Sequence, residues 1–194
     1  LSSVDFIING FIDKREEDLK KYKILLPCFQ EKNFIFKNEY RFILGVGDPI
    51  TKKTMLENLS KYNLNFEQII HPTTILAPTA QVGSGSIICP FSILPANSQI
   101  KEYVLINSFV SIGHDAIIDK YTTVSPHVSI GGNASIGKCC FIGSNASIAP
   151  GVRVGDFSKI SANSFVCEDV KPGSLAVGVP ARCKEKYYNI YDFK

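Results

Sequence analysis

The sequence predicts a small α/β domain followed by a parallel β-helix, and three observations lead to this fold class. From residue 82 to residue 166, every sixth residue is aliphatic without exception. The residue two places before each aliphatic is always small or β-branched, and the segment before His71 lacks this period. A fixed short period is the signature of a repeat architecture. The aliphatic positions are Val82, Ile88, Leu94, Ile100, Ile106, Ile112, Ile118, Val124, Ile130, Ile136, Ile142, Ile148, Val154, Ile160 and Val166.

The six-residue period determines the shape of each repeat. Because side chains alternate between the two faces of a strand, the aliphatic residue and the small residue before it point the same way. Glycine, asparagine or aspartate often follows the aliphatic, and we expect it to supply the positive φ of a tight turn. Three strand-and-turn units make a triangular coil with the aliphatics inside, and residues 82–171 predict five coils. Successive coils should hydrogen-bond at about 4.8 Å, as parallel strands do.

The segment before His71 alternates between strand and helix patterns. Val4–Ile8, Phe11–Ile12, Arg41–Val46 and Phe66–Ile70 predict strands, and Arg15–Lys21 predicts a short helix. This alternation indicates a small parallel α/β domain.

A second helix is predicted between the last two of these strands. Asp48 can cap it and Pro49 can occupy its first position. Its apolar face would consist of Met55, Leu56, Leu59 and Tyr62. We therefore divide the chain into an α/β domain at 1–70, a β-helix at 71–181 and a polar tail at 182–194.

Composition excludes several classes of protein. The formal net charge is +3 with interspersed signs, which argues against nucleic acid as the main partner. We find neither a long apolar run nor a signal-peptide pattern, so we expect no membrane insertion and a cytoplasmic location. The six cysteines show no metal-ligand spacing, and we expect reduced structural cysteines and no metal.

The candidate chemistry lies at one corner of the β-helix, in His114 and Asp115. A neutral imidazole can accept a proton from an attacking amine or hydroxyl near pH 7, and an adjacent carboxylate can orient the ring. Gly132 follows one coil later and should stack on the same edge, where its N–H could stabilise an oxyanion. A solvated corner histidine and an ordinary turn glycine are the alternatives.

The motifs from His71-Pro72 to Gly178–Ala181 resemble those of the sialic-acid O-acetyltransferase and nucleotide-4-aminosugar N-acetyltransferase family. The shared features are His114-Asp115, Gly131-Gly132 and the closing Gly-Val-Pro-Ala. The resemblance implies a left-handed β-helix with hexapeptide repeats, assembled as a homotrimer with active sites between subunits. It also implies that His114 is the general base, that Asp115 supports it and that acetyl-CoA is the co-substrate. Gly132, Ser144 and Ala162 are the expected acetyl-CoA contacts.

In this family the N-terminal domain binds the nucleotide-sugar. Gly10–Lys14 resembles a segment that contacts the base or ribose, which implies a substrate role for Asp13 and Lys14. Gly45, Gly47 and Asp48 resemble the family's second strand-to-helix turn. From the residues alone this is a weak phosphate-loop signal, and an ordinary turn with Asp48 as helix cap is the alternative. The family usually has a further β-α unit before Val4, so we expect the first β-α unit to be missing here.

The sequence departs from the family at three positions near the acyl donor. Thr123 stands where the family often has a second histidine, His127 replaces a glycine, and Ala162 replaces another glycine. These departures affect the details of the CoA site rather than the chemistry of transfer.

The prediction is direct transfer of acetyl from acetyl-CoA to the 4-amino group of a nucleotide-linked deoxy-aminosugar. The nearer alternative is O-acetylation of a sugar hydroxyl of the sialic-acid type by the same residues. The further alternative is a non-enzymatic β-helix that serves as a scaffold or nucleotide-sugar sensor.

Overall fold

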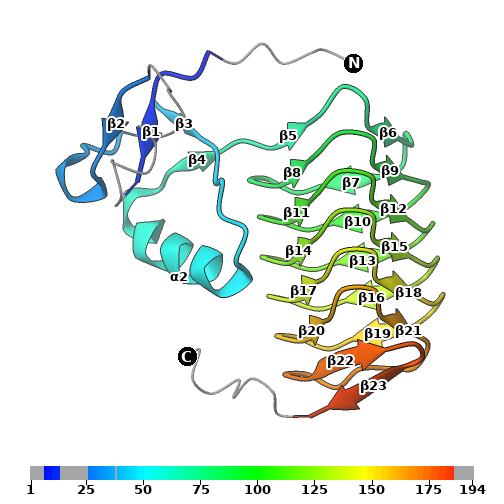
Figure 1. Ribbon diagram of the computed structural model, residues 1–194. Coiled ribbons are helices and arrows are strands. Elements are labelled where there is room, and N and C mark those ends of the chain that lie inside the picture. The colour runs from blue at the N-terminus through cyan, green and yellow to red at the C-terminus, as the bar shows by residue number, and fades with distance from the viewer. Residues whose placement is uncertain (1–6, 14–25, 38, 186–194) are drawn as a thin grey trace.

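The computed structural model describes residues 7–13, 26–37 and 39–185, and in these residues both predicted parts are present (Figure 1). The C-terminal part is a stack of triangular coils, and the N-terminal part lies beside it. The first three residues of the strand expected over Val4–Ile8, the helix expected over Arg15–Lys21 and the site residue Lys14 lie outside the described residues. Ile7 and Ile8, the end of that expected strand, are exposed and belong to no strand.

In the described residues of the α/β part, two parallel strand pairs and one helix are present. β1 (Phe11–Ile12) pairs with β2 (Cys28–Phe29), and β3 (Arg41–Phe42) pairs with β4 (Asn65–Phe66). The helix α2 (Pro49–Leu59) connects β3 to β4 and begins at the predicted cap. Short 3-10 turns, η1 (Glu31–Asn33) and η2 (Ser60–Tyr62), complete this part.

Two strand predictions in this region need correction. Of the strand expected over Arg41–Val46, only the first two residues form a strand, which is β3, and Ile43 is substantially exposed. The strand expected over Phe66–Ile70 is two strands in different sheets, because β5 (Ile69–Ile70) pairs with β8 of the β-helix. Ile70 continues the six-residue spacing of Leu76 and Val82, and all three pack against the same core, so the coils begin before residue 71.

The β-helix has three parallel sheets, which the chain visits in turn as sheet I, sheet II and sheet III. Each coil adds one short strand to each sheet, and that strand pairs with its equivalent in the next coil, as Gln99 pairs with Ile117. Sheet I contains β5, β8 (Ile87–Ile88), β11 (Leu105–Ile106), β14 (Thr123–Val124), β17 (Phe141–Ile142), β20 (Lys159–Ile160), β22 (Leu175–Gly178) and β23 (Ala181–Lys184). Sheet II contains β6 (Ile75–Leu76), β9 (Ile93–Leu94), β12 (Ser111–Ile112), β15 (Ser129–Ile130), β18 (Ser147–Ile148) and β21 (Phe165–Val166). Sheet III contains β7 (Gln81–Val82), β10 (Gln99–Ile100), β13 (Ile117–Ile118), β16 (Ser135–Ile136) and β19 (Arg153–Val154).

The interior of the coils confirms the predicted pattern. Ile88, Ile106 and Ile118 are completely buried, and so are small residues two places before the aliphatics. Buried serines at these positions are satisfied by the backbone. The Ser86 hydroxyl donates to the Lys101 carbonyl at 2.7 Å and accepts from the Val104 N–H at 2.9 Å. The core therefore combines apolar rows with polar side chains that pair with the backbone of the β-helix, as Ser86 does with the next coil.

The role predicted for the residue after each aliphatic is wrong. The positive φ angles occur three places after each aliphatic, and therefore two places after the residue that was expected to adopt them, as at Phe109, Asp115 and Tyr121. Glycine after the aliphatic serves a different purpose, namely close approach of coils. A Cβ on Gly113 would overlap the Gly132 nitrogen, which no side chain tolerates.

The last strands close the stack with an antiparallel hairpin. β22 pairs in parallel with β20, and β23 then returns antiparallel to β22. The turn between them is the Gly178–Ala181 motif seen in the sequence.

Candidate active site

The corner between sheets II and III, called the II–III corner, carries His114 and Asp115. Both residues lie in the turn between β12 and β13, two and three places after the inward-facing Ile112. Both side chains are exposed, at 64% and 45%. The imidazole is thus presented to solvent by a rigid turn, where it can meet a substrate.

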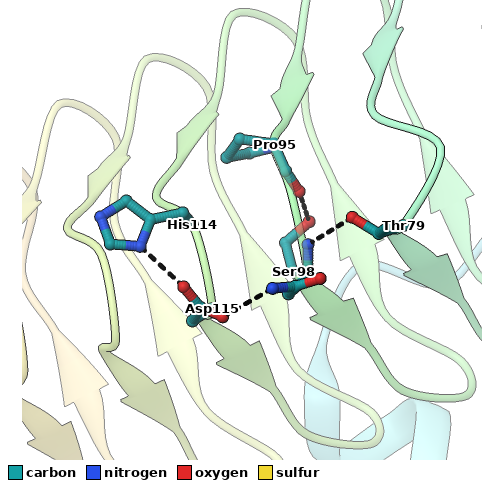
Figure 2. Close-up of polar contacts among 6 residues, drawn as sticks. Thr79, Pro95, Ser98, His114 and Asp115 are labelled. Carbon is teal, nitrogen blue, oxygen red and sulfur yellow. Dashed lines mark hydrogen bonds and ion pairs between the residues drawn. The ribbon is translucent and has the colours of Figure 1, made fainter.

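The predicted pairing of these two side chains is present. Nδ1 of His114 lies 2.8 Å from Oδ2 of Asp115 (Figure 2). Because an ionised carboxylate only accepts hydrogen bonds, this contact assigns the ring proton to Nδ1. The other ring nitrogen, Nε2, then carries a lone pair and points away from the carboxylate. This is the arrangement a general base requires.

A row of polar residues on the same corner supports Asp115 from the previous coil. Nδ2 of Asn97 donates to Oδ1 of Asp115 at 3.0 Å, and Oγ1 of Thr79 accepts from the Asn97 N–H at 3.0 Å. The hydrogen bonds from His114 and Asn97 lower the pKa of the Asp115 carboxyl below its ordinary value. Asp115 has a φ of 59°, a conformation that aspartate and asparagine tolerate better than most residues. Aspartate at this position therefore both tolerates the backbone conformation of the turn and hydrogen-bonds the histidine.

Gly132 stacks beneath His114, as the spacing of one coil predicted. A Cβ on Gly132 would lie 2.8 Å from Nε2 of His114, so glycine leaves room for the ring. The Asn133 N–H donates to the His114 carbonyl at 2.8 Å, whereas the Gly132 N–H has no acceptor among the described residues. The residue that packs against Nε2 of His114 therefore has a backbone N–H without an acceptor among the described residues.

The other two residues expected to bind acetyl-CoA lie on a different corner of the chain. Ser144 and Ala162 stand between sheets I and II, at the I–II corner. They occupy equivalent positions in successive coils, where the Asn163 N–H donates to the Ser144 carbonyl at 2.9 Å. Within one chain, the structure does not bring these residues together with His114.

The residues expected to bind the nucleotide-sugar lie in the α/β part. Asp13 follows β1, and Gly45, Gly47 and Asp48 lie between β3 and α2. Asp48 caps α2, because its Oδ1 accepts from the N–H and the hydroxyl of Thr51 at 2.8 and 2.7 Å. A Cβ on Gly45 or Gly47 would meet nothing within 4 Å, and neither residue has a positive φ. The fold itself does not require these two glycines.

One unusual residue, the buried Lys52 of α2, was not predicted from the sequence. It follows Pro49 by three places and precedes Leu56 by four, so it lies on the buried face of the helix. The signal was present in this spacing, but a lysine at such a position is normally assumed to reach solvent.

In the part of the chain that the structure describes, every helix is too short or too polar to span a bilayer. Among the same residues, no three His, Cys, Asp or Glu side chains gather where they could hold a metal ion.

The repeat matches a known family model, and the fold matches known structures. Residues 133–168 match the model of the bacterial transferase hexapeptide (six repeats). A search of curated proteins found no match.

Solved structures resemble nearly the whole chain. The acetyltransferase domain of PglB from Neisseria gonorrhoeae has a TM-score of 0.78 at 21% identity, covering 89% of this chain and 97% of that one. PerB from Caulobacter crescentus, in complex with CoA and GDP-perosamine, has a TM-score of 0.76 at 20% identity, covering 90% and 96%. WeeI from Acinetobacter baumannii has a TM-score of 0.78 at 19% identity, covering 90% and 98%. The chain thus carries the bacterial transferase hexapeptide repeat and has the fold of these proteins, a left-handed β-helix preceded by a small α/β domain.

Proposed function

We propose that the protein transfers acetyl from acetyl-CoA to the 4-amino group of a nucleotide-linked deoxy-aminosugar. The observation that carries the proposal is the II–III corner. There an imidazole oriented by a carboxylate lies beside a backbone N–H that has no acceptor among the described residues. The structural neighbour PerB, which was solved with CoA and GDP-perosamine, supports the choice of substrates.

The proposed reaction is direct transfer without an acyl-enzyme. The neutral sugar amine attacks the thioester carbonyl carbon, and a C–N bond forms while Nε2 of His114 takes the proton from nitrogen. The Gly132 N–H stabilises the negative oxygen of the tetrahedral intermediate. The C–S bond then breaks, and the CoA thiolate leaves and takes up a proton. Asp115 holds the ring in the tautomer that exposes Nε2 and stabilises the imidazolium that forms.

The nucleotide-sugar is assigned to the α/β part, with Asp13 and Lys14 on the nucleoside and the Gly45–Asp48 loop on the phosphates. The open space around Gly45 and Gly47 supports this assignment, because glycine allows a ligand to approach the backbone closely. Asp48 contributes by capping the helix that follows the loop. Both substrates are cytoplasmic metabolites, so we place the protein in the cytoplasm.

A homotrimer with sites between subunits completes this proposal. The outward side chains of sheet II are uncharged, and Ile75, Ile93 and Phe165 are at least 40% exposed on it. Exposed apolar faces of this kind indicate association. In a ring of three copies with sheet II toward the axis, the II–III corner of one copy meets the I–II corner of the next. That arrangement would bring His114 next to Ser144 and Ala162 of a neighbouring copy, where acetyl-CoA would lie.

The experiment that tests the proposal is release of CoA thiol from acetyl-CoA with a panel of acceptors. The panel contains nucleotide-linked 4-amino sugars on UDP, dTDP, GDP and CMP carriers, together with sialic acid. Turnover on one amino sugar is the expected result and identifies the carrier. Turnover only on a hydroxyl acceptor would replace the proposal with O-acetyl transfer. A trimer that neither binds CoA nor turns over would contradict enzymatic function and favour a scaffold or sensor.

A further inference from the structure

Lys52 is a charged side chain buried between the two parts of the molecule. Only 2% of its surface is exposed, and it is among the largest fully buried side chains in the described residues. It belongs to the first turns of α2, yet its ammonium ends in the β-helix. Nζ donates to the Tyr103 carbonyl at 3.0 Å, to the Thr123 hydroxyl at 3.1 Å and, more weakly, to the Thr122 carbonyl at 3.4 Å.

The ammonium has only neutral partners. No carboxylate forms an ion pair with Lys52 within the part of the chain that is described. From the β-helix it faces Cys139, whose thiol is kept neutral because burial raises its pKa to about 12. The phenols of Tyr103 and Tyr121 on the same corner also have raised pKa values because they are partly buried. From its own helix the charged group that acts on it is Asp48 at the cap.

Burial of this charge without an ion pair weakens the contact between the two parts. Burial lowers the pKa of Lys52 from 10.5 to about 8, so near pH 7 the docked lysine is mostly charged and its desolvation opposes docking. A hydrophobic residue of the same length would dock α2 more firmly. The presence of a lysine instead indicates that position 52 does not serve to dock α2 as tightly as possible.

Lys52 is directly connected to the loop assigned to the nucleotide-sugar. Its own N–H donates to the Asp48 carbonyl at 2.9 Å, and Asp48 is the last residue of the Gly45–Asp48 loop. At its other end the side chain contacts Thr123 in β14, the position where the sequence resemblance places a second histidine near the acyl donor. The Lys52 side chain therefore ties the first turn of α2, which directly follows the Gly45–Asp48 loop, to strand β14.

We propose that Lys52 is a positioning residue that couples the Gly45–Asp48 loop to the β-helix, and that the charge on its amine sets how firmly α2 is docked. The coupling to substrate rests on the proposed function, whereas the docking does not. The docked state binds fewer protons than the undocked state between pH 8 and pH 10.5. Docking therefore strengthens as the pH rises, and opening of α2 should fall on the order of tenfold from pH 7 to pH 9.

The test is amide hydrogen exchange of the α2 segment 49–59 in the full chain between pH 7 and pH 9. Rates are corrected for the intrinsic effect of pH on exchange. The variants are Lys52→Met, which keeps the length and removes the charge, and Lys52→Arg, which cannot lose its charge in this range. Lys53→Met is the matched control, because the neighbouring Lys53 pairs with Glu57 on the helix surface at 2.6 Å.

We expect the tenfold change in opening in wild type and in Lys53→Met, and a flat profile in both Lys52 variants. A flat wild-type profile, or a tenfold change that persists in Lys52→Met, would overturn the proposed role of the charge. For substrate coupling, Lys52→Met should change KM for the nucleotide-sugar several-fold and leave KM for acetyl-CoA unchanged. An unchanged nucleotide-sugar KM would overturn the coupling. Failure of the proposed function would appear separately, as absence of turnover in wild type.

Discussion

The β-helix and the α/β part achieve order in different ways. In the β-helix, each strand has an equivalent neighbour in the adjacent coil, and buried rows run the length of the stack. In the α/β part, strands of two residues form separate pairs, and buried residues such as Leu44, Leu56 and Leu59 are few. Repetition gives the β-helix its own continuous core, whereas we expect the α/β part to depend on docking against it. The proposed base lies on the β-helix, and the proposed acceptor loop lies on the α/β part.

The two parts should differ most in the free energy of unfolding that is lost when a cavity is made in each. Ile118→Ala removes a completely buried side chain between two coils and should lower the free energy of unfolding by about 2–5 kcal/mol. Leu56→Ala in α2 should cost less and should increase hydrogen exchange mainly in segment 49–59. Chemical denaturation and exchange measure both. Equal global destabilisation by the two variants would show that the parts unfold as one unit.

Glycines provide the next comparison. Gly113→Ala places a Cβ against the Gly132 backbone, so the coils must separate, at a cost of about 1–3 kcal/mol. Gly47→Ala meets open space and should change the stability by less than about 0.5 kcal/mol. Thermal unfolding distinguishes the two. A stable Gly113→Ala protein would contradict the role of glycine in close approach.

At the II–III corner, Asp115→Asn should lower kcat about tenfold, because the amide no longer stabilises the imidazolium. The substitution should leave the fold intact, since asparagine also tolerates the positive φ of this turn. Asp119→Asn is the control, a carboxylate in the same coil that hydrogen-bonds the Lys120 N–H instead. Steady-state rates with the acceptor identified from the panel are the measurement. Equal rates for Asp115→Asn and wild type would remove Asp115 from the mechanism.

The smallest expected effect concerns the support of Asp115 from the previous coil. Asn97→Ala removes one of the two hydrogen bonds that lower the pKa of the Asp115 carboxyl, so that pKa should rise. The Asp115 carboxylate would then become protonated, and lose its charge, at a higher pH than in wild type as the solution is acidified. Carboxyl chemical shifts followed through an acid titration measure the change. A titration that coincides with wild type would show that Asn97 contributes nothing to the charge state.

The sequence predicted the regular part better than the irregular part, for a physical reason. A period of six constrains every coil at once, so the rows, the II–III corner and the stacking of Gly132 on His114 followed from spacing alone. The glycine role was assigned incorrectly, because the close approach of Gly113 to the next coil is not visible in one repeat. In the α/β part, Ile69–Ile70 matched a local strand pattern, but its partner lies in the β-helix. Lys52 shares the buried face of α2 with Pro49 and Leu56, but it was not predicted to be buried, because a lysine at such a position is normally assumed to reach solvent and its burial results from docking against the β-helix.

The role of His114 as the general base of acetyl transfer is tested most directly by kcat of His114→Ala. The control is His71→Ala, a histidine of the first coil whose Nδ1 lies 2.9 Å from the Thr73 hydroxyl. We expect His114→Ala to lower kcat by about 10²–10⁴-fold, with an unchanged melting temperature, and His71→Ala to retain activity. Wild-type kcat in a folded His114→Ala protein would show that His114 is not the general base.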